Sequence, residues 1–467
     1  MATERIEINP VTRIEGHAKI TVNLDAGGKV SDALFSVHSF RGFERFLKGA
    51  PVERLPAITS RICGICYTAH RICSVRALEN ALNVKVSNTT DKLRRLLLFG
   101  QYIESHALSL VLLSLPDLLY PREKPKNRNV QYLLAKHREL VEAALRLRTA
   151  GSRCAEVVGR RAVHPISAVI GGITTPLTDD ERKTLDTELD GGKEALDGLM
   201  EVFVSVLEKG DDEILGLGAI ESNYFGLHDG DKLSFDRGTL RLIDSAGATL
   251  ADFPAEDYFD YVKEEEADFS YMKFPVTKDG ASFRVGPLAR VNIAAEAPTQ
   301  AAADALAKFE GFLPRPWNGT IPYHYARLVE AIYAWEAAKE LLDDPDITSD
   351  DVKPKPLKMK AAEGIGVLEA PRGTLVHNYV LSADGFCEKA QFVVATQHNN
   401  AGINESLNET AARIVKGPDV PEVDLNKLEM IVRAYDPCLS CATHELAGRP
   451  FEIEVRGAGG DVLRSWS

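Results

Sequence analysis

Two short cysteine motifs, one near each end of the chain, constrain the fold of this sequence more than any other feature. RICGICYTAH and DPCLSCATH each place two residues between a pair of cysteines and follow the pair, within four residues, by a histidine. Neither motif supplies four thiolates by itself, so a shared metal site requires the two ends of the chain to meet. The residues concerned are Cys63, Cys66 and His70 in the first motif and Cys438, Cys441 and His444 in the second.

The spacing of the two pairs bears on which metal they could bind. Structural zinc sites made of two such pairs usually place them about 15 to 20 residues apart, because the site organises a small local fold. A single pair is often no more than two buried thiols. Four thiolates suit nickel, iron or zinc better than magnesium or calcium. Two facing turns would offer two terminal and two bridging sulfurs, and that arrangement would support a second metal.

Length and charge limit the classes of protein that this chain can represent. At 467 residues it could by length alone hold about three domains, but no Pro-rich or Ser-rich linker divides it. We therefore predict one domain, residues 1–467. The net charge of −13 and the pI near 5.5 argue against nucleic-acid binding, which requires clustered Lys and Arg. Proteins and small molecules are the expected partners.

The cysteine content and the apolar segments indicate the compartment. Seven cysteines, unevenly placed, do not make the disulfide framework of a secreted protein. MATERIEINPVTRIEG lacks the basic start and apolar stretch of a signal peptide, which predicts a cytoplasmic location, unless an exported partner supplies the signal. LRRLLLFGQYIESHALSLVLLSLPDLLY predicts a buried helix, because Glu104, His106, Pro116 and Asp117 interrupt the about 20 apolar residues that a membrane span needs.

Hydrophobic periodicity predicts an α+β fold: a mainly helical body with a central bundle of long helices, small peripheral sheets, and N- and C-terminal segments that meet at the metal site. HAKITVNLDAGGKVSDALFSV alternates like a hairpin, residues 88–148 have helical spacing, and Thr178 and Glu181 form a capping box at a helix start. DGDKLSFDRGTLRLIDSAGATLADF and ASFRVGPLARVNI predict strands and turns. RPWNGTIPYHYARLVEAIYAWEAAKELLDD predicts a long amphipathic helix, and FEIEVRGAGGDVLRSWS predicts a second hairpin.

The two cysteine motifs resemble the first and last signature motifs of the large subunit of nickel-iron hydrogenases. VTRIEGH, RGFE, HPISAVIGG and EAPRG, at residues 11–17, 41–44, 164–172 and 369–373, follow in the order of that family. The resemblance extends over most of the chain. It implies an enzyme that cleaves dihydrogen heterolytically and reversibly to protons and electrons.

The resemblance also implies a metal centre and a path for the proton. Nickel would be bound by the four cysteines, with Cys66 and Cys441 bridging to an iron that carries cyanide and carbon monoxide, and with Cys63 and Cys438 terminal. Cys438 is then a candidate base, because metal binding keeps its sulfur deprotonated until hydrogen cleavage supplies the proton. Glu15 in RIEG would receive that proton, although a glutamate is more often a surface carboxylate.

Further residues match the family's motifs around this centre. Glu44 and His444 resemble the ligands of a hard divalent cation, magnesium or a similar ion, although ordinary hydrogen bonds would also explain such a pair. Arg372 in EAPRG resembles the guanidinium that lies over the metals and donates to a cyanide. Asp117 and Asp436 are plausible carboxylates for holding Arg372, and either could instead be a cap or turn residue.

Two more positions bear on the centre and on the subgroup. His70 would donate to a cluster sulfur, or it would be an ordinary buried histidine. Uptake-type members carry VVPS or VVPT near the iron ligands, whereas this chain reads VVATQHNN. Ala395 stands where those members have proline, and Thr396 retains a hydroxyl at the next position. The sequence is thus most similar to the cytoplasmic multi-subunit group, particularly the enzymes associated with heterodisulfide reductase. NAD-coupled and deazaflavin-coupled types remain alternatives.

Electrons must leave through other polypeptides. Cys73, Cys154 and Cys387 form no iron-sulfur pattern, and no G-x-G-x-x-G follows a strand. The predicted partners are an iron-sulfur small subunit, together with a heterodisulfide reductase or a flavoprotein. The resemblance further implies proteolysis after His444, which makes residues 445–467 a candidate processing peptide.

Two other functional classes remain open on the sequence. A hydrogen-sensing member would keep the metals but act in signalling, and a structural zinc protein would bind neither nickel nor iron. The quinone-site subunit of respiratory complex I shares the fold of the family but lacks the cysteines, so the intact set argues against that class.

Overall fold

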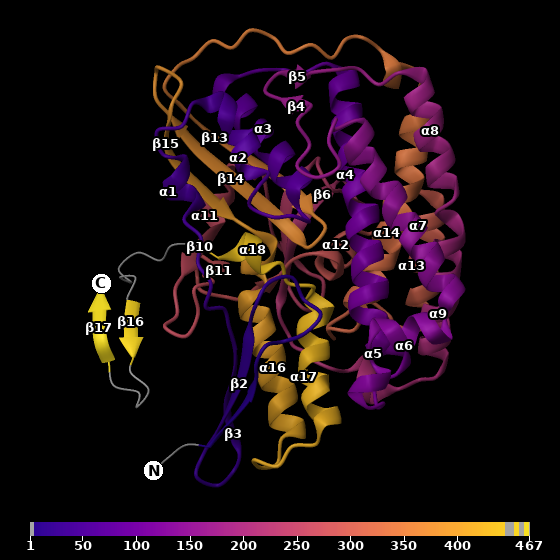
Figure 1. The fold of residues 1–467 in the computed structure, drawn as a ribbon, viewed down its shortest axis with the longest axis vertical. Helices are drawn as coiled ribbons and strands as arrows, with labels where there is room; N and C mark the ends of the chain where they lie inside the picture. Colours follow the sequence, from indigo (N-terminus) through magenta and orange to yellow (C-terminus); the bar gives the residue numbers. More distant parts are fainter. Residues whose placement is uncertain (1–3, 444–452, 457–461, 467) are drawn as a thin grey trace.

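The computed structural model of the chain describes residues 4–443, 453–456 and 462–466. Long helices stand side by side through the body of the molecule (Figure 1). The described helices of more than ten residues are α3 (Tyr67–Leu82), α4 (Asn88–Ala107), α7 (Arg138–Val157), α8 (Asp179–Asp190), α9 (Lys193–Glu208), α13 (Gln300–Glu310), α14 (Pro322–Asp343), α16 (Asn400–Ile414) and α17 (Glu422–Tyr435). The shorter helices are α1 (Phe43–Leu47), α2 (Leu55–Thr59), α5 (Leu115–Leu119), α6 (Val130–Lys136), α10 (Asp212–Leu215), α11 (Tyr258–Tyr261), α12 (Pro287–Ile293), α15 (Ala395–His398) and α18 (Leu439–Ala442).

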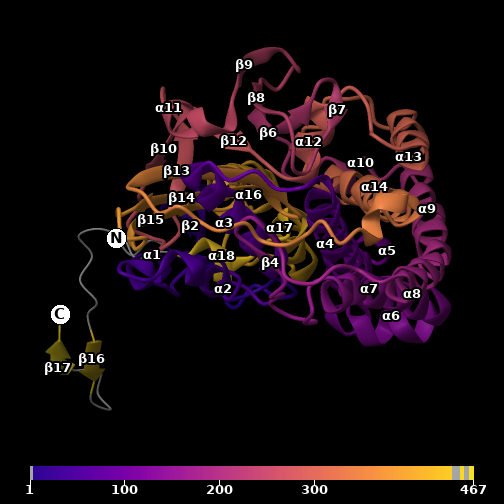
Figure 2. The same cartoon turned by 90° about the horizontal axis from the view of Figure 1, so that it is seen from above.

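Small, mostly antiparallel sheets lie around this body, as predicted. Figure 2 shows β6 to β9 on the side of the molecule opposite α6, α7 and α8. The sheets are β1 (Arg5–Ile8), β2 (Lys19–Leu24) and β3 (Val30–Ser36); β13 (Ala362–Ala370), β14 (Gly373–Leu381) and β15 (Cys387–Val393); β6 (Asn223–Asp229), β7 (Lys232–Leu233), β8 (Thr239–Ile243), β9 (Thr249–Phe253) and β12 (Phe283–Arg284); β4 (Ala168–Val169) and β5 (Gly172–Ile173); β10 (Val262–Glu265) and β11 (Phe274–Thr277); and β16 (Ile453–Arg456) and β17 (Val462–Trp466).

The most apolar helical segment is buried inside the protein. Helix α4 continues through a π-helical segment, Leu108–Ser114, into α5. The whole run, Asn88–Leu119, is long and apolar enough to span a membrane, but 83% of its most apolar window is buried by the rest of the chain. Packing within the protein therefore accounts for its hydrophobicity.

Helices α4 and α7 approach each other closely because glycines face each other at the contact. A Cβ atom on Gly151 would lie 2.6 Å from the carbonyl oxygen of Gly100 and 2.6 Å from the amide nitrogen of Glu104. Both neighbours are backbone atoms, which cannot move aside without separating the helices. The small residues therefore decide how near α7 comes to the helix that lies beside the site.

The substitution Gly151→Ala should lower the free energy of unfolding by roughly 1 to 3 kcal/mol, the usual cost of overpacking. Denaturant unfolding followed by circular dichroism would measure the change. Gly191→Ala is a suitable control, because its Cβ would meet only one atom, at 3.4 Å, and should change the stability by less than about 0.5 kcal/mol. Equal stability of the two variants would contradict a tight α4–α7 contact.

Several local predictions are confirmed and two are wrong. The first hairpin is formed by β2 and β3, the second by β16 and β17, and the capping box of Thr178 and Glu181 is present. The segment PLARVNI forms helix α12 rather than a strand, because Pro287 follows Gly286 and occupies the first helical turn. Helix α14 is not amphipathic: it runs through the middle of the fold and is buried on nearly every side.

An N-terminal segment and a C-terminal segment of the chain meet at α18. Glu15 and Cys438 form an isolated parallel β-bridge, and the Leu439 amide donates to the Glu15 carbonyl (3.1 Å). Figure 1 shows α18 between the β13–β15 sheet and the α16–α17 pair. Gly16 permits this approach, because it has a positive φ of 88° and a Cβ there would lie 2.7 Å from Leu439 Cβ.

Candidate metal centre

The four cysteines of the two motifs converge at one buried point, as the sequence predicted. Their Sγ atoms all lie within 4.8 Å of one another. Cys438 Sγ is 3.2 Å from Cys63 Sγ and 3.1 Å from Cys441 Sγ. Cys66 immediately precedes α3, and Cys438 immediately precedes α18. Two helix starts therefore present the thiols toward each other.

The chemistry of this donor set fits a soft transition metal. Four buried sulfurs at these separations can surround a metal, and sulfur ligands favour nickel, iron or zinc over hard cations. Hydrogen bonding from Cys438 lowers the pKa of Cys66 well below its usual value. Hydrogen bonding from Cys441 raises the pKa of Cys438, and burial raises the pKa of Cys441, well above their usual values. Asp436 Oδ2 is also buried here and has no hydrogen-bond partner among the described residues.

Arg372 lies at the tip of a hairpin that points into the sulfur cluster. Ala370 pairs with Gly373, so Pro371 and Arg372 form the two-residue turn between β13 and β14. The guanidinium donates from Nη1 to Cys66 Sγ (3.4 Å) and to Ser105 Oγ (3.1 Å). Burial opposes the positive charge, but Asp436 and the cysteines raise the pKa of Arg372 well above its usual value. The arginine therefore carries a fixed charge beside the thiolates.

Asp436 holds this arginine, and Asp117 does not. Arg372 donates from Nε to the Asp436 carbonyl (2.7 Å) and from Nη2 to Asp436 Oδ1 (3.1 Å). The two carboxylate oxygens of Asp117 accept instead from Arg13 and Arg433. The prediction that Asp117 holds Arg372 is therefore wrong, because both of its oxygens accept hydrogen bonds from other arginines, Arg13 and Arg433.

A fully buried ion cluster supports the hairpin tip, and it was not predicted from the sequence. Arg290 donates to Glu330 Oε2 (2.7 Å) and to Glu369 Oε2 (2.6 Å). It also donates to the carbonyl oxygens of Ala370 (3.1 Å) and Pro371 (3.2 Å), the residues directly before Arg372. The sequence of α14 did not single out Glu330, because the helix also carries Arg327, Glu336, Lys339, Glu340 and Asp343.

Glu15 lies against the segment that carries Cys438. Its Oε2 accepts from the Ser440 amide (2.9 Å), and its Oε1 accepts from the Ser440 hydroxyl. The side chain is only partly buried. The carboxylate thus lies against the residue between Leu439 and Cys441, and it is partly accessible to solvent.

His70 is part of a buried hydrogen-bonded chain that begins at a thiol. Its Nε2 is 3.4 Å from Cys441 Sγ, and its Nδ1 is 3.0 Å from His377 Nε2. His377 Nδ1 lies 3.1 Å from the Tyr379 hydroxyl, which is 2.8 Å from Ser74 Oγ. Burial, together with His70, lowers the pKa of His377 well below its usual value. Only the first histidine of this chain was predicted from the sequence.

The remaining predicted residues are placed as follows. Thr396 Oγ1 accepts from the Cys438 amide (2.8 Å), so its hydroxyl helps to orient a cysteine of the cluster. Glu44, on α1, accepts through Oε1 from the Phe392 amide (3.0 Å). His444, its expected companion in a cation site, lies outside the described residues.

Comparisons with known proteins agree with this geometry. The family described as nickel-dependent hydrogenase matches residues 41–119 and 243–444, and a HoxL-like family matches residues 5–40. The chain is 34% identical over 469 residues to a subunit of the vhc F420-non-reducing hydrogenase of Methanococcus voltae, covering 98% of this chain and 99% of the relative. It is 36% identical over 488 residues to the beta subunit of the NAD-reducing hydrogenase HoxS of Cupriavidus necator, covering 99% of each.

Solved structures show the same relationship at the level of the fold. The crystal structure of an NAD+-reducing [NiFe]-hydrogenase in the H2-reduced state superposes with a TM-score of 0.91 at 34% identity, covering 95% of this chain and 100% of the other. Four converging cysteines, the shared fold and matches along most of the chain lead to one conclusion. This chain belongs to the nickel-dependent hydrogenase family, as a large subunit that carries the nickel-iron site.

Proposed function

We propose that this chain is the hydrogen-cleaving subunit of a cytoplasmic multi-subunit enzyme that passes electrons first to an iron-sulfur small subunit, then to heterodisulfide reductase. The convergence of four thiols beside Arg372, with Glu15 bound to Ser440, carries the catalytic part of the proposal. The similarity to F420-non-reducing hydrogenase subunits supports the choice of electron acceptor. The similarity to NAD-reducing hydrogenases supports a second candidate, an NAD-coupled enzyme.

Cys63, Cys66, Cys438 and Cys441 would hold a nickel-iron centre, with cyanide and carbon monoxide as further ligands of the iron. When bound, this centre would supply the redox chemistry that separates dihydrogen into protons and electrons. Arg372 places a fixed positive charge in the buried site, and the Nη2 N–H that is not bonded to Asp436 is suited to a cyanide nitrogen.

The chain's own groups would carry the proton away. The thiolate of Cys438 accepts it first, and Glu15 accepts it next, because the carboxylate is fixed to the Ser440 amide two residues after that cysteine. Thr396 steadies the Cys438 backbone during this transfer. His70 orients toward Cys441 Sγ and stabilises negative charge on that sulfur. Asp436 keeps the arginine in place.

The functional test is an elemental and kinetic analysis of the purified complex with its co-purifying subunits. We expect the large subunit to contain nickel and iron, and the complex to reduce a viologen dye under hydrogen. A protein that contains zinc but neither nickel nor iron would overturn the proposal. Very slow turnover together with a signalling kinase as partner would identify a hydrogen sensor. A flavoprotein partner that reduces NAD would favour the second candidate over heterodisulfide reductase.

We also propose that residues 445–467 are removed from the active enzyme, and that Glu44 and His444 bind magnesium or a similar cation at the new chain end. The intact mass of nickel-loaded protein should correspond to a chain that ends at His444. Active enzyme whose mass still includes residues 445–467 would contradict the processing step. Magnesium in the metal analysis of wild type, and its loss in Glu44→Gln, would support the cation site.

A further inference from the structure

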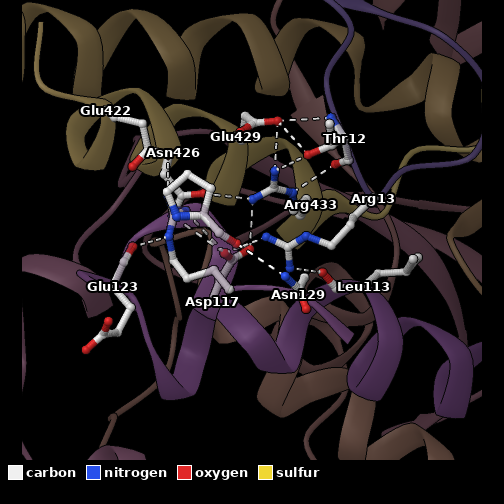
Figure 3. Close-up of polar contacts among 12 residues, drawn as sticks. Thr12, Arg13, Leu113, Asp117, Glu123, Asn129, Glu422, Asn426, Glu429 and Arg433 are labelled. Carbon is white, nitrogen blue, oxygen red and sulfur yellow. Dashed lines mark hydrogen bonds and ion pairs between the residues drawn. The ribbon is translucent and has the colours of Figure 1, made fainter. Parts of the chain in front are cut away.

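Asp117 joins three segments of the chain that are far apart in sequence. It lies on α5, where its Oδ1 accepts from Arg13 Nη2 (2.6 Å) and its Oδ2 accepts from Arg433 Nη1 (2.9 Å). Figure 3 shows the two guanidinium groups converging on this one carboxylate. Burial alone would raise the pKa of Asp117, but Arg433 and Arg13 hold it below its usual value. A third arginine, Arg128, lies farther away, with its Nη1 3.9 Å from Oδ1. The aspartate is therefore a buried anion whose two hydrogen-bonded cations are Arg13 and Arg433.

Arg13 has a second anchor in an unusual stretch of backbone. Its Nη1 donates to the carbonyl oxygen of Leu113 (2.7 Å), which belongs to the π-helical segment Leu108–Ser114. Helical segments of this kind are rare and occur frequently at functional sites. The fork of the guanidinium thus bridges Leu113 and Asp117, and this geometry requires an arginine rather than a lysine.

Helix α17 holds the neighbouring residue, Thr12, at three atoms. Arg433 donates from Nε to the Thr12 carbonyl (2.9 Å) and from Nη2 to Thr12 Oγ1 (2.8 Å). Glu429 Oε1 accepts from the Thr12 amide (2.9 Å). The same helix ends at Tyr435, three residues before Cys438. One rigid element therefore places both the N-terminal segment and a cysteine of the cluster.

The backbone of Arg13 needs this support. Its φ is +58°, a left-handed conformation that is unfavourable for a residue with a side chain and persists only where the surroundings hold it. Glu15 follows two residues later, and its carboxylate meets Ser440. Proton transfer depends steeply on such placement, because donor and acceptor must stay within hydrogen-bonding reach.

We propose that Asp117 is a positioning residue for proton transfer: by neutralising and orienting Arg13 and Arg433, it keeps residues 12–16 in the conformation that holds Glu15 against Ser440. This inference rests on the proposed role of Glu15 as the proton acceptor after Cys438. It assigns to Asp117 a function on the proton path and not at Arg372.

The test is Asp117→Asn in the complete, metal-loaded complex. The amide keeps the shape of the side chain but removes the shared negative charge, so the left-handed turn should relax. We expect nickel and iron contents equal to those of wild type, at least a tenfold slower exchange between deuterium gas and water, and a larger solvent isotope effect on that exchange. A role in folding alone would not raise the isotope effect.

Asp236→Asn is the matched control. The side chains of Asp236 and Asp117 are both 4% exposed, and Asp236 also pairs with arginines, Arg76 at 2.8 Å and Arg95 at 3.6 Å. It does not hold the N-terminal segment. This variant should exchange hydrogen like wild type. Equal slowing in the two variants, or unchanged exchange and isotope effect in Asp117→Asn, would overturn the inference.

Two further variants keep the outcomes separable. If Asp117→Asn yields no metal-loaded enzyme, Arg13→Lys takes its place. Lysine retains a cation opposite Asp117, but it cannot donate to Asp117 and to the Leu113 carbonyl at the same time. Wild-type exchange in Arg13→Lys would refute the inference. Glu15→Gln tests the relay itself. Slow exchange in Glu15→Gln with normal exchange in Asp117→Asn would refute only the positioning role, whereas normal exchange in Glu15→Gln would refute the relay.

Discussion

Cys441→Ser should abolish nickel binding and lower the rate of hydrogen uptake far more than any change around the site. The Cys441 sulfur lies 3.1 Å from that of Cys438 and is buried. A serine hydroxyl is a hard ligand and stays protonated where a thiol ionises, so it cannot complete a soft, four-thiolate set. Loss of a group that merely supports a ligand costs about 10-fold to 100-fold, and loss of the ligand itself should exceed that range.

Elemental analysis and dye reduction under hydrogen would measure this effect. Cys154→Ser is the matched control, because Cys154 is also fully buried but donates only to the Ala150 carbonyl within its own helix. The control should retain nickel and activity even if its stability falls. A Cys441→Ser enzyme with a full complement of nickel would exclude this sulfur as a ligand.

Glu15→Gln should leave the metal content unchanged and slow the exchange of deuterium gas with water by about 10²-fold to 10⁴-fold, the range typical of losing a general acid or base. Glutamine has the shape of glutamate and can still accept from the Ser440 amide, but it cannot take up the proton. The hydrogen bonds that place Glu15 would largely persist, so the effect would report proton transfer rather than folding.

The variant Glu15→Asp distinguishes the effect of removing the carboxylate from the effect of moving it. Aspartate keeps the acid but is one methylene shorter, so it should exchange faster than the glutamine variant and more slowly than wild type. Exchange at the wild-type rate in Glu15→Gln would remove this residue from the proton path and would leave the four-cysteine site unaffected.

The cysteines of the site lie in short motifs, whereas the residues that hold the site in place are scattered along the chain. The convergence of Cys63, Cys66, Cys438 and Cys441 could be predicted because each pair lies in a short motif, whereas the role of Arg372 was implied only by the resemblance to a family. The Arg290–Glu330–Glu369 cluster and the His377–Tyr379 chain consist of residues whose partners lie far away along the chain. No local pattern predicts which of them will meet.

By itself the sequence determined the local features: the capping box at Thr178, the hairpin of β2 and β3, and the two cysteine pairs whose sulfurs converge. Caps, alternation and ligand chemistry depend on residues that are neighbours in the chain. Only the tertiary structure decided that PLARVNI becomes α12, that α14 is buried on nearly every side, and that Asp117 pairs with Arg13 and Arg433 instead of Arg372. These outcomes depend on which faces of elements far apart in the sequence pack together. Burial of apolar surface over the whole chain determines that packing.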